Sequence, residues 1–394
     1  MNLSNIHKIK RRIFGHEQLI SDSSICPIYY SNLNNWHLIG RGYKAIRHLQ
    51  IPLSSISILK EYLLRPAYFA VYEILNPLVI VFKWPNGELK FFLLTQNGHL
   101  LDPCESSAWD IYFPFLSHDL QTNVLASISI PKDVIPVEID NWIWYPNHNN
   151  YTHFFFDSFV HVAFAQQVLQ QKYINKYQLP LIHKAPGWQV ELIDRLSPQK
   201  YFHPSIDDHQ SFQIFHVKKL MLPVLSHRIM SLDWLRGYLA AAFLKDSLNS
   251  IRDSKTIDLI MVTRYDDRRR RITNIDEIES LVVNYGGSLI DASCHSISEK
   301  FILFNQCKVC IAESSGCMNF ALFSPESSHL IALTDPSVVN KSEFVPGGWD
   351  YITGYANRTS FVIGEDPIDL AGSPLGSATY SLVAIKALLL KYLS

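Results

Sequence analysis

The spacing of hydrophobic and polar positions changes along the chain, first near residue 140. Before that point, residues 67–84 and 88–101 form runs rich in β-branched and aromatic side chains. Pro-Asn-Gly follows the first run and Gln-Asn-Gly lies within the second, and both tripeptides are turn signals. We therefore expect residues 1–140 to form a β-rich, antiparallel N-terminal portion.

From residue 141 onward, apolar runs of strand length alternate with segments of helical periodicity. Alternation of this kind is typical of a parallel α/β layer. The sequence predicts strands at 141–146, 179–183 and 212–223, and helices at 150–173, 187–197 and 231–250.

A polar segment, residues 251–256, separates this region from a second alternation and predicts a domain boundary. The second alternation is the pattern of a doubly wound, Rossmann-like domain. An amphipathic helix over residues 380–394 is the last predicted element. Before it, strands are predicted at 257–264, 288–292, 308–312 and 329–333, and helices at 275–286, 296–306 and 317–323.

Composition narrows the functional classes. A length of 394 residues suits two domains. With 47% hydrophobic and 18% charged residues, the chain can fill packed cores and differs from a disordered protein. A net charge of −1 argues against a nucleic-acid binder held by a basic surface.

The sequence contains no apolar run of the roughly 18–20 residues that span a bilayer. Its basic N-terminus lacks the apolar stretch of a signal peptide, so we expect a cytoplasmic protein. Those basic residues allow two interpretations, a peripheral contact with an anionic membrane or a solvated tail, and their small number favours the tail.

The six cysteines are too dispersed for a disulfide framework. Cys307 and Cys310 have the spacing of a zinc or redox pair, but they lie in a predicted strand. Residues three apart on a strand face opposite ways, so we expect both to be buried structural cysteines.

The first candidate binding residue is Arg264, which directly follows the apolar run 257–263 and opens a basic loop. In open parallel sheets, ligands bind outside the carboxyl ends of the strands. A guanidinium there suits a phosphate or diphosphate, because its planar fork donates two charge-assisted hydrogen bonds. The alternative is a solvated basic loop. Asn274 and Glu277 have the spacing of a capping box for the next helix.

The second candidate is the turn Ser314-Ser315-Gly316, which follows a strand and precedes a helix. Small residues let a ligand approach the backbone closely, and the first amides of a helix have no partners within it. Such a turn is a candidate anion site, although an ordinary tight turn has the same pattern. Arg264 would lie at the same edge of the same sheet.

The third candidate lies in the first α/β region. His153, Asp157 and His161 are spaced by four, so they share one face of the predicted helix. A histidine in the first helical turn is kept neutral by the helix dipole and can act as a base, with Asp157 orienting it or serving as the base itself. A metal pair is an alternative that lacks a further evident ligand. A buried His–Asp pair with a structural role is another.

Three segments, 149–159, 262–278 and 296–333, resemble in order the motif blocks of glycosyltransferase family 61, and together cover roughly residues 145–335. Two departures are Glu313 and Ser314, where the family has His and Gly. Beside a diphosphate, Glu313 would have to point away or contact a ribose or sugar hydroxyl. The positions that match are Asn150, His153 and Asp157 in the first block, Arg264, Arg271 and Asn274 in the second, and Ser315, Gly316 and Asn319 in the third.

The resemblance implies a GT-B-like α/β fold, in which two Rossmann-like domains face each other across a cleft. With the β-rich portion at 1–140, it predicts an acceptor domain at 141–252 and a nucleotide-sugar-binding domain at 253–378. The helix at 379–394 would pack back onto the N-terminal domain.

The resemblance also implies an inverting, metal-independent transfer of a sugar from a nucleotide sugar to a saccharide acceptor, without a cofactor, in bacterial capsule or surface-polysaccharide synthesis. Asp157 or His153 would be the base. The donor-binding residues would be Arg264, Arg271, Asn274, Glu313, Ser314, Ser315, Gly316 and Asn319. The alternatives are a GT-B-like epimerase or phosphorylase and a catalytically inactive nucleotide-binding subunit. The sequence predicts neither the donor sugar, the linkage nor the oligomeric state.

Overall fold

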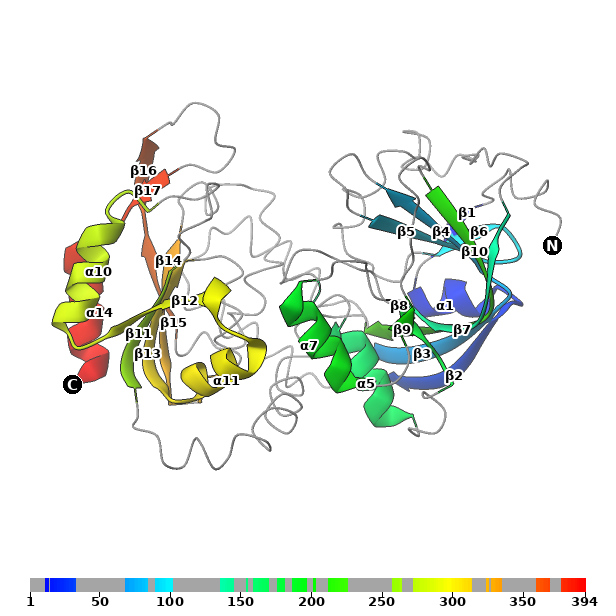
Figure 1. Ribbon diagram of the computed structural model, residues 1–394, viewed down its shortest axis with the longest axis horizontal. Helices are drawn as coiled ribbons and strands as arrows, with labels where there is room; N and C mark the ends of the chain where they lie inside the picture. The colour runs from blue at the N-terminus through cyan, green and yellow to red at the C-terminus, as the bar shows by residue number, and fades with distance from the viewer. Residues whose placement is uncertain are drawn as a thin grey trace. The chain divides into compact units, whose positions relative to one another are not determined.

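The protein is described from a computed structural model (Figure 1). Two compact units divide the chain. Unit 1 comprises Met1–Asn34 and Pro66–His227, and unit 2 comprises Asn35–Arg65 and Arg228–Ser394. The structure describes residues 11–13, 15–32, 68–83, 89–101, 135–144, 154, 159–169, 176–180, 186–196, 201–202, 212–225, 257–263, 272–313, 324–325, 327–334, 359–368 and 377–394.

Unit 1 is built on a curled, mainly antiparallel sheet (Figure 1). Its strands follow the order β1-β6-β5-β4-β10-β3-β2, and β7 pairs with β10 outside this path. The short helix α1 (Gly15–Ile20) precedes β2. The strands are β1 (Arg11–Ile13), β2 (Ile25–Asn32), β3 (Tyr68–Leu75), β4 (Leu78–Lys83), β5 (Leu89–Leu94), β6 (His99–Leu101), β7 (Val137–Ile143) and β10 (Phe212–Leu225).

The strand β10 organises the whole sheet. It pairs antiparallel with β4 and then with β3 in one continuous register, from Phe212 opposite Phe82 to Leu225 opposite Phe69. Between β4 and β3 the ladder continues, because the Asn76 amide donates to the Lys218 carbonyl at 2.9 Å. Asn76 has a φ of 49°, a conformation that asparagine tolerates better than most residues, so β3 and β4 are one kinked strand along β10.

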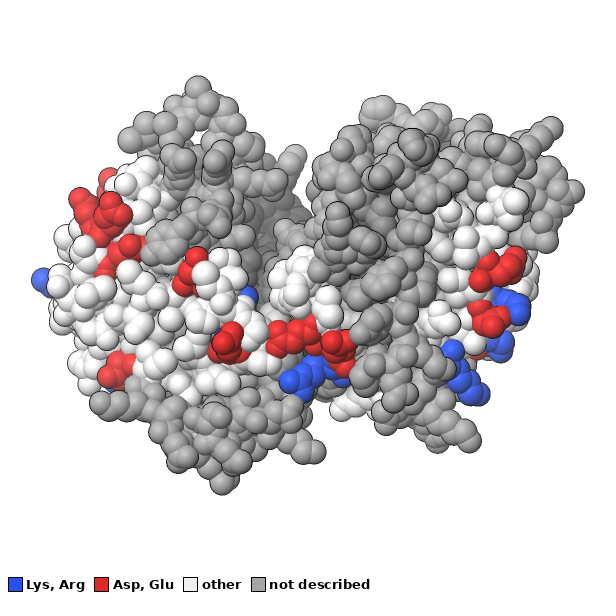
Figure 2. Space-filling view, viewed as in Figure 1, with Lys and Arg blue, Asp and Glu red and all other residues white. Residues whose placement is uncertain are grey.

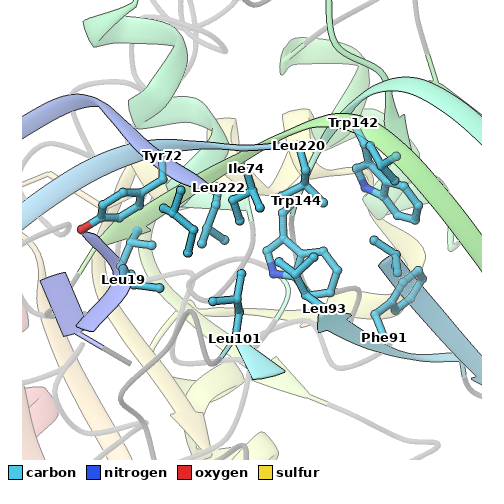
Figure 3. Packing of buried hydrophobic residues seen from close by; sticks show 14 of the residues in the cluster. Leu19, Tyr72, Ile74, Phe91, Leu93, Leu101, Trp142, Trp144, Leu220 and Leu222 are labelled. Carbon is cyan, nitrogen blue, oxygen red and sulfur yellow. The ribbon is translucent and has the colours of Figure 1, made fainter. Parts of the chain in front are cut away.

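Large aromatic and aliphatic side chains from α1 and the sheet fill the core of unit 1 (Figure 3). Phe91 meets Trp142 and Trp144 edge to face, with ring centroids 6.4 and 6.3 Å apart. Trp142 packs against Phe215 of β10 in the same way at 5.5 Å. Each such aromatic pair adds about 0.5–1.5 kcal/mol beyond the burial of its surface.

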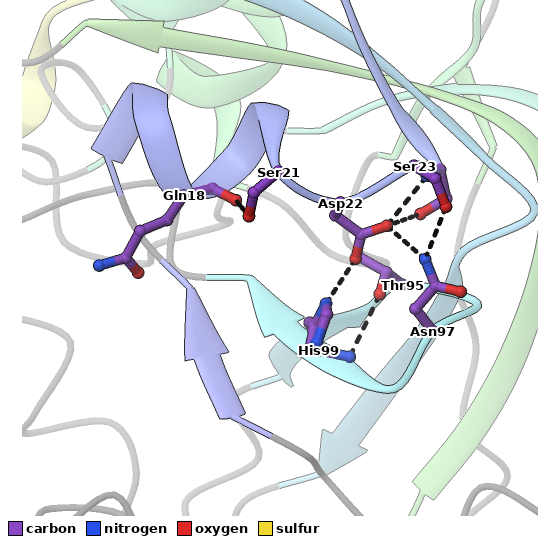
Figure 4. Close-up of polar contacts among 8 residues, drawn as sticks. Gln18, Ser21, Asp22, Ser23, Thr95, Asn97 and His99 are labelled. Carbon is purple, nitrogen blue, oxygen red and sulfur yellow. Dashed lines mark hydrogen bonds and ion pairs between the residues drawn. The ribbon is translucent and has the colours of Figure 1, made fainter.

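A polar cluster joins the end of α1 to the turn between β5 and β6 (Figure 4). Asp22 accepts hydrogen bonds from the Ser24 amide and hydroxyl, from Asn97 Nδ2 at 2.6 Å and from His99 Nδ1 at 2.6 Å. Burial by itself would raise the pKa of Asp22. The hydrogen bonds from Ser24, His99 and Thr95 together outweigh burial and lower this pKa. The cluster therefore holds an ionised carboxylate inside unit 1.

A short parallel extension lies along the free edge of β10. The chain runs from β7 through α5 (Val160–Val168) to β8 (Leu179–Pro180), and through α7 (Gly187–Leu196) to β9 (Tyr201–Phe202). β7 is parallel to β10, Trp142 bridges in parallel to Gln178 just before β8, and β8 is parallel to β9.

We expected residues 141–252 to form the first of two facing Rossmann-like domains, and this prediction is wrong. The alternation of strands and helices is present, but β8 and β9 have only two residues each. β10 has 14 residues and pairs along one edge with β3 and β4, which lie far upstream in the sequence. The sheet of unit 1 is therefore mostly antiparallel, and the expected GT-B arrangement is not found.

Unit 2 contains a parallel five-stranded sheet in the order β12-β11-β13-β14-β15. Its helices include α10, α11 and α14, and a two-stranded antiparallel sheet, β16 (Glu365–Ile368) with β17 (Ser377–Thr379), follows β15. The elements are β11 (Ile257–Thr263), α10 (Ile275–Asn284), β12 (Ser288–Asp291), the 3₁₀ turn η7 (Ala292–Cys294), α11 (Ile297–Asn305), β13 (Cys307–Glu313), β14 (His329–Thr334), β15 (Thr359–Ile363) and α14 (Leu382–Leu393).

Helices cover both faces of this sheet (Figure 1). α10 and α14 pack side by side on one face, where Ile278, Val282, Ile385 and Leu389 join the core formed with the strands. α11 lies against β13 on the other face. Within each face the apolar side chains come from both helices and strands, as expected for a doubly wound sheet.

We expected residues 379–394 to pack back onto the N-terminal domain, and this stays a prediction. Within unit 2, α14 contacts β13, β14, β15 and α10. Ile385 and Leu389 are fully buried there. The stretches 231–250, 251–256 and 317–323, for which we predicted a helix, a boundary and a helix, lie outside the described residues.

Candidate functional site

The carboxyl edge of the sheet in unit 2 has the geometry of a ligand site. The order of its strands along the chain is 2-1-3-4-5, so connections after β11 and after β13 leave toward opposite sides of the sheet. Such a reversal leaves a crevice between the two neighbouring strands, and ligands of open α/β sheets bind there. β11 and β13 are parallel neighbours, with Val262 opposite Ala312.

Two of the predicted site segments directly follow these two strands. Arg264 comes immediately after Thr263, the last residue of β11, and Ser314 comes immediately after Glu313, the last residue of β13. The strands therefore deliver both segments to one edge at the switch point. The predicted residues themselves, Arg264, Arg271, Ser314, Ser315, Gly316 and Asn319, lie outside the described residues.

The described residues at this edge are tied into the sheet. Thr263 is buried, and its hydroxyl donates to the Ile290 carbonyl of β12 at 3.3 Å. Glu313 is half-buried and stands opposite Leu333 of β14. Glu313 thus occupies the strand tip from which the small-residue turn departs.

Asn274 has a different role from the capping one expected for it. It stands at the N-cap of α10, but its side chain makes no capping hydrogen bond. Instead Nδ2 donates to the Tyr380 carbonyl at 2.8 Å, and Oδ1 accepts from the Tyr380 amide at 3.0 Å. The neighbouring Thr273 amide also donates to the Ala378 carbonyl at 3.0 Å. Asn274 therefore clamps the start of α10 to the segment that begins α14.

The first turn of α10 is acidic, with Asp276 and Glu277. These carboxylates stabilise the helix dipole but repel any anion near that helix end. Acidic side chains gather over α10 in the space-filling view (Figure 2). Among the helices that the structure describes in unit 2, α10 is consequently unsuited to hold a diphosphate at its N-terminus.

Asp291 is a polar residue that we did not predict as part of a site. It ends β12 opposite Thr263 of β11, so it lies at the same carboxyl edge. Its Oδ1 accepts from the Ser293 hydroxyl at 2.6 Å and the Ser293 amide at 2.8 Å. Chiefly the hydroxyl bond lowers the pKa of Asp291, against a small opposing effect of burial. The sequence signal was available, because this carboxylate ends the strand next to the one that precedes Arg264.

In unit 1, His153 and Asp157 lie outside the described residues, whereas His161 is described. His161 is buried in α5, and its Nδ1 lies 3.3 Å from the Pro223 carbonyl near the carboxyl end of β10, to which it can donate. Of His153, Asp157 and His161, the last is therefore a buried residue whose contact with β10 is structural. Within the described ranges, no group of three or more His, Cys, Asp or Glu side chains could hold a metal ion.

The cysteine pair is buried in β13, which confirms our expectation of structural cysteines. Burial raises the pKa of Cys307 to about 12, and its thiol donates to the Val309 carbonyl at 2.9 Å. A buried thiol with a raised pKa is a poor nucleophile at neutral pH. Separately, none of the helices in the described ranges is long and apolar enough to cross a membrane.

Comparison with known proteins gives one result for residues 151–331, which match the family model described as glycosyltransferase 61. No curated protein matches the chain significantly. The matched region contains α5 of unit 1 and β11 and β13 of unit 2 and ends within β14, so it includes both strands of the switch point. By this match residues 151–331 are a glycosyltransferase 61 domain, which supports a glycosyltransferase activity.

Proposed function

We propose that the protein is an inverting, metal-independent glycosyltransferase that moves a sugar from a nucleotide-sugar donor to a saccharide acceptor. The observation that carries the donor class is the switch point between β11 and β13, directly before Arg264 and Ser314. A nucleotide-sugar donor leaves as a nucleoside diphosphate, and its growing negative charge needs cationic or amide partners.

In the proposed reaction, the acceptor hydroxyl oxygen forms a bond to the anomeric carbon of the donor sugar. The bond from that carbon to the β-phosphate oxygen breaks, and the electron pair stays with the nucleoside diphosphate. Arg264, with Arg271, neutralises that charge, and the amides at Ser315 and Gly316 bind the phosphate oxygens. Asp157 or His153 takes the proton from the attacking hydroxyl. Attack opposite the leaving group inverts the anomeric configuration.

The acceptor class follows from the family resemblance. We propose a saccharide acceptor in bacterial capsule or surface-polysaccharide synthesis, with the reaction on the cytoplasmic side of the membrane. A second candidate function is a nucleotide-binding subunit without turnover. Glu313 favours it, because a carboxylate replaces the family's histidine at the tip of β13 and would repel a nearby diphosphate.

A binding and turnover experiment tests the proposal. Nucleoside diphosphates should raise the melting temperature, since a ligand at 100 times its Kd stabilises the native state by about 2.7 kcal/mol. Arg264→Ala should remove this effect and lower kcat/KM by about 100-fold or more. The matched control is Lys386→Ala, which removes an exposed cation from α14 in the same unit.

The outcomes separate the candidates. Transfer to a saccharide with inverted configuration supports the proposal, and binding without turnover supports the inactive subunit. Conversion of the nucleotide sugar in the absence of any acceptor would identify an epimerase instead. Normal turnover of the Arg264→Ala variant would refute the role of this arginine.

A further inference from the structure

The outer sides of α10 and α14 form one exposed surface of unit 2, which we call the α10/α14 face. The two helices lie side by side on the side of the sheet opposite α11 (Figure 1). We propose that this face binds a second copy of the chain, so that the protein forms a weak two-fold dimer through α10 and α14. The inference goes beyond the proposed function and does not depend on it.

The two helices run in the same direction and begin at about the same level. α10 starts after the carboxyl end of β11 and ends before the amino end of β12. α14 starts beside it, because the Asn274 side chain bonds to the main chain of Tyr380 just before α14. α14 ends near the amino end of β13, where Lys308 Nζ donates to the Leu393 carbonyl at 3.5 Å. Corresponding positions of the two helices therefore lie level with each other.

Apolar side chains are exposed along this face. Val383 and Leu390 on α14 are 80% and 56% exposed, and Val283 on α10 is 55% exposed. Ala387 is exposed between the two α14 residues. Positions 383, 387 and 390 share one side of the helix because they are spaced by four and three. The side of a helix that faces water is normally polar, so this apolar stripe indicates an interaction surface.

The charges of the two helices are opposite in sign. α10 carries Asp276, Glu277 and Glu279 and no basic residue, whereas α14 carries Lys386 and Lys391 and no acidic residue. The acidic side chains over α10 are visible in Figure 2. A rotation of 180° about an axis parallel to the helices and between them places α10 of one copy on α14 of the other. The acidic helix then meets the basic helix twice, so the face is complementary to itself.

The same rotation brings exposed apolar side chains together. Val283 and Leu390 are each the ninth residue of their helix. At a rise of about 1.5 Å per residue, both lie about 12 Å from the start of the helix. Rotation about an axis parallel to the helices keeps this level. Val283 of one copy therefore meets Leu390 of the second copy, and the contact occurs twice.

The charges also argue against an anionic membrane as the occupant of the α10/α14 face. Membranes of this kind attract helices with an excess of Lys and Arg. Three acidic and two basic side chains leave the α10/α14 face without such an excess. A second copy of the chain satisfies both signs of charge, so we favour it.

The size of the face predicts a weak dimer. α10 has 10 residues and α14 has 12, so the face is about 18 Å long and about 20 Å wide. Its projected area is about 360 Å² per copy, below the roughly 800 Å² per partner of stable interfaces. We expect a Kd of about 10–100 µM. Because surface charges contribute, raising NaCl from about 50 to about 500 mM should weaken the dimer about 5-fold.

Two charge-reversed variants of the full chain test the pairing. Asp276→Lys with Glu277→Lys places lysines on both helices, and Lys386→Glu with Lys391→Glu places only acidic residues on both. Each variant alone should associate at least about 10-fold more weakly than the wild type, because like charges now meet. An equal mixture of the two should recover the wild-type affinity, because the lysines of one variant then face the carboxylates of the other.

Leu390→Gln tests the apolar contact and should also weaken the dimer about 10-fold. Ile363→Gln is the matched control, because Ile363 is 53% exposed on β15 of the same unit and lies outside the α10/α14 face. This control should leave the Kd unchanged. Sedimentation velocity from about 5 to about 200 µM measures association, and melting temperatures report on folding.

The outcomes decide the inference. A wild-type protein that stays monomeric at the highest concentration overturns it, and binding of that monomer to vesicles of anionic phospholipid would assign the face to a membrane instead. Wild-type affinity in both charge-reversed variants, or a mixture of folded variants that does not associate, also overturns it. If one charge-reversed variant does not fold, the other variant and the comparison of Leu390→Gln with Ile363→Gln decide.

Discussion

The substitution Asn274→Ala separates two roles for a residue that the family resemblance places in donor binding. The side chain of Asn274 makes two hydrogen bonds with the main chain of Tyr380, at 2.8 and 3.0 Å. Tyr380 is itself buried, so alanine would leave one amide and one carbonyl without these partners. Each buried unsatisfied polar group costs about 1–3 kcal/mol, and with partial access of water we expect a total of about 2–3 kcal/mol.

Thermal and urea unfolding of the full chain measure this loss. For a domain of 150–250 residues, each kcal/mol lowers the melting temperature by about 2–4 °C, so Asn274→Ala should unfold about 4–12 °C lower. Asn284→Ala is the matched control, because Asn284 is exposed at the last position of the same helix. This control should shift the melting temperature by less than about 2 °C.

The alternative role predicts a different result. If Asn274 contacted the donor and the clamp were unimportant, Asn274→Ala would raise KM for the donor and leave the melting temperature unchanged. That outcome would refute the structural role. A lower melting temperature together with unchanged KM at a temperature where the variant is folded would remove Asn274 from the donor site.

Two further predictions concern unit 1. Because the pKa of Asp22 is lowered in the folded state, its stabilising effect is present above the unfolded-state pKa of about 4 and is lost as the pH falls below that value. Urea unfolding from pH 7 to pH 2 should show this loss of stability. Asp22→Asn should lower the free energy of unfolding by about 3 kcal/mol at pH 7 and reduce its decrease at acid pH. If the free energy of unfolding of the variant depended on pH as it does in the wild type, the role of the carboxylate would be contradicted. For the catalytic base, Asp157→Asn and His153→Ala should each be assayed for transfer at saturating donor. The residue that acts as the base should lose about 100-fold or more in kcat, and full activity in both variants would place the base elsewhere.

Local patterns of the sequence predicted the elements of unit 2 well. The expected strands at 257–264, 288–292, 308–312 and 329–333 correspond to β11, β12, β13 and β14. Buried parallel strands are continuous apolar runs, and the helices between them have clear periodicity, so each element carries its own signal. The approach of β11 and β13 at one edge also followed from the alternation of strands and helices.

The failures came from interactions between distant segments. Asn274 and Glu277 have the spacing of a capping box, and so do Ser296 and Glu299, yet only the second pair forms one. The Asn274 side chain bonds to the main chain of Tyr380 instead of capping α10, and the sequence around residue 274 does not indicate this distant partner. Likewise, the 14-residue length of β10 did not reveal that it pairs with β3 and β4 rather than with parallel neighbours alone.

The central place of β10 has a consequence for biosynthesis. The side chains of Lys219 and Glu73 meet across this sheet although they are 146 residues apart in the sequence. During translation, β3 and β4 cannot pair with β10 until β10 has been synthesised. The entropic cost of closing the long loop between β4 and β10 also slows this pairing. A nascent chain that has not yet emerged beyond residue 225 exposes the apolar edge that β10 will cover, so this interval is when the polypeptide most needs protection from aggregation.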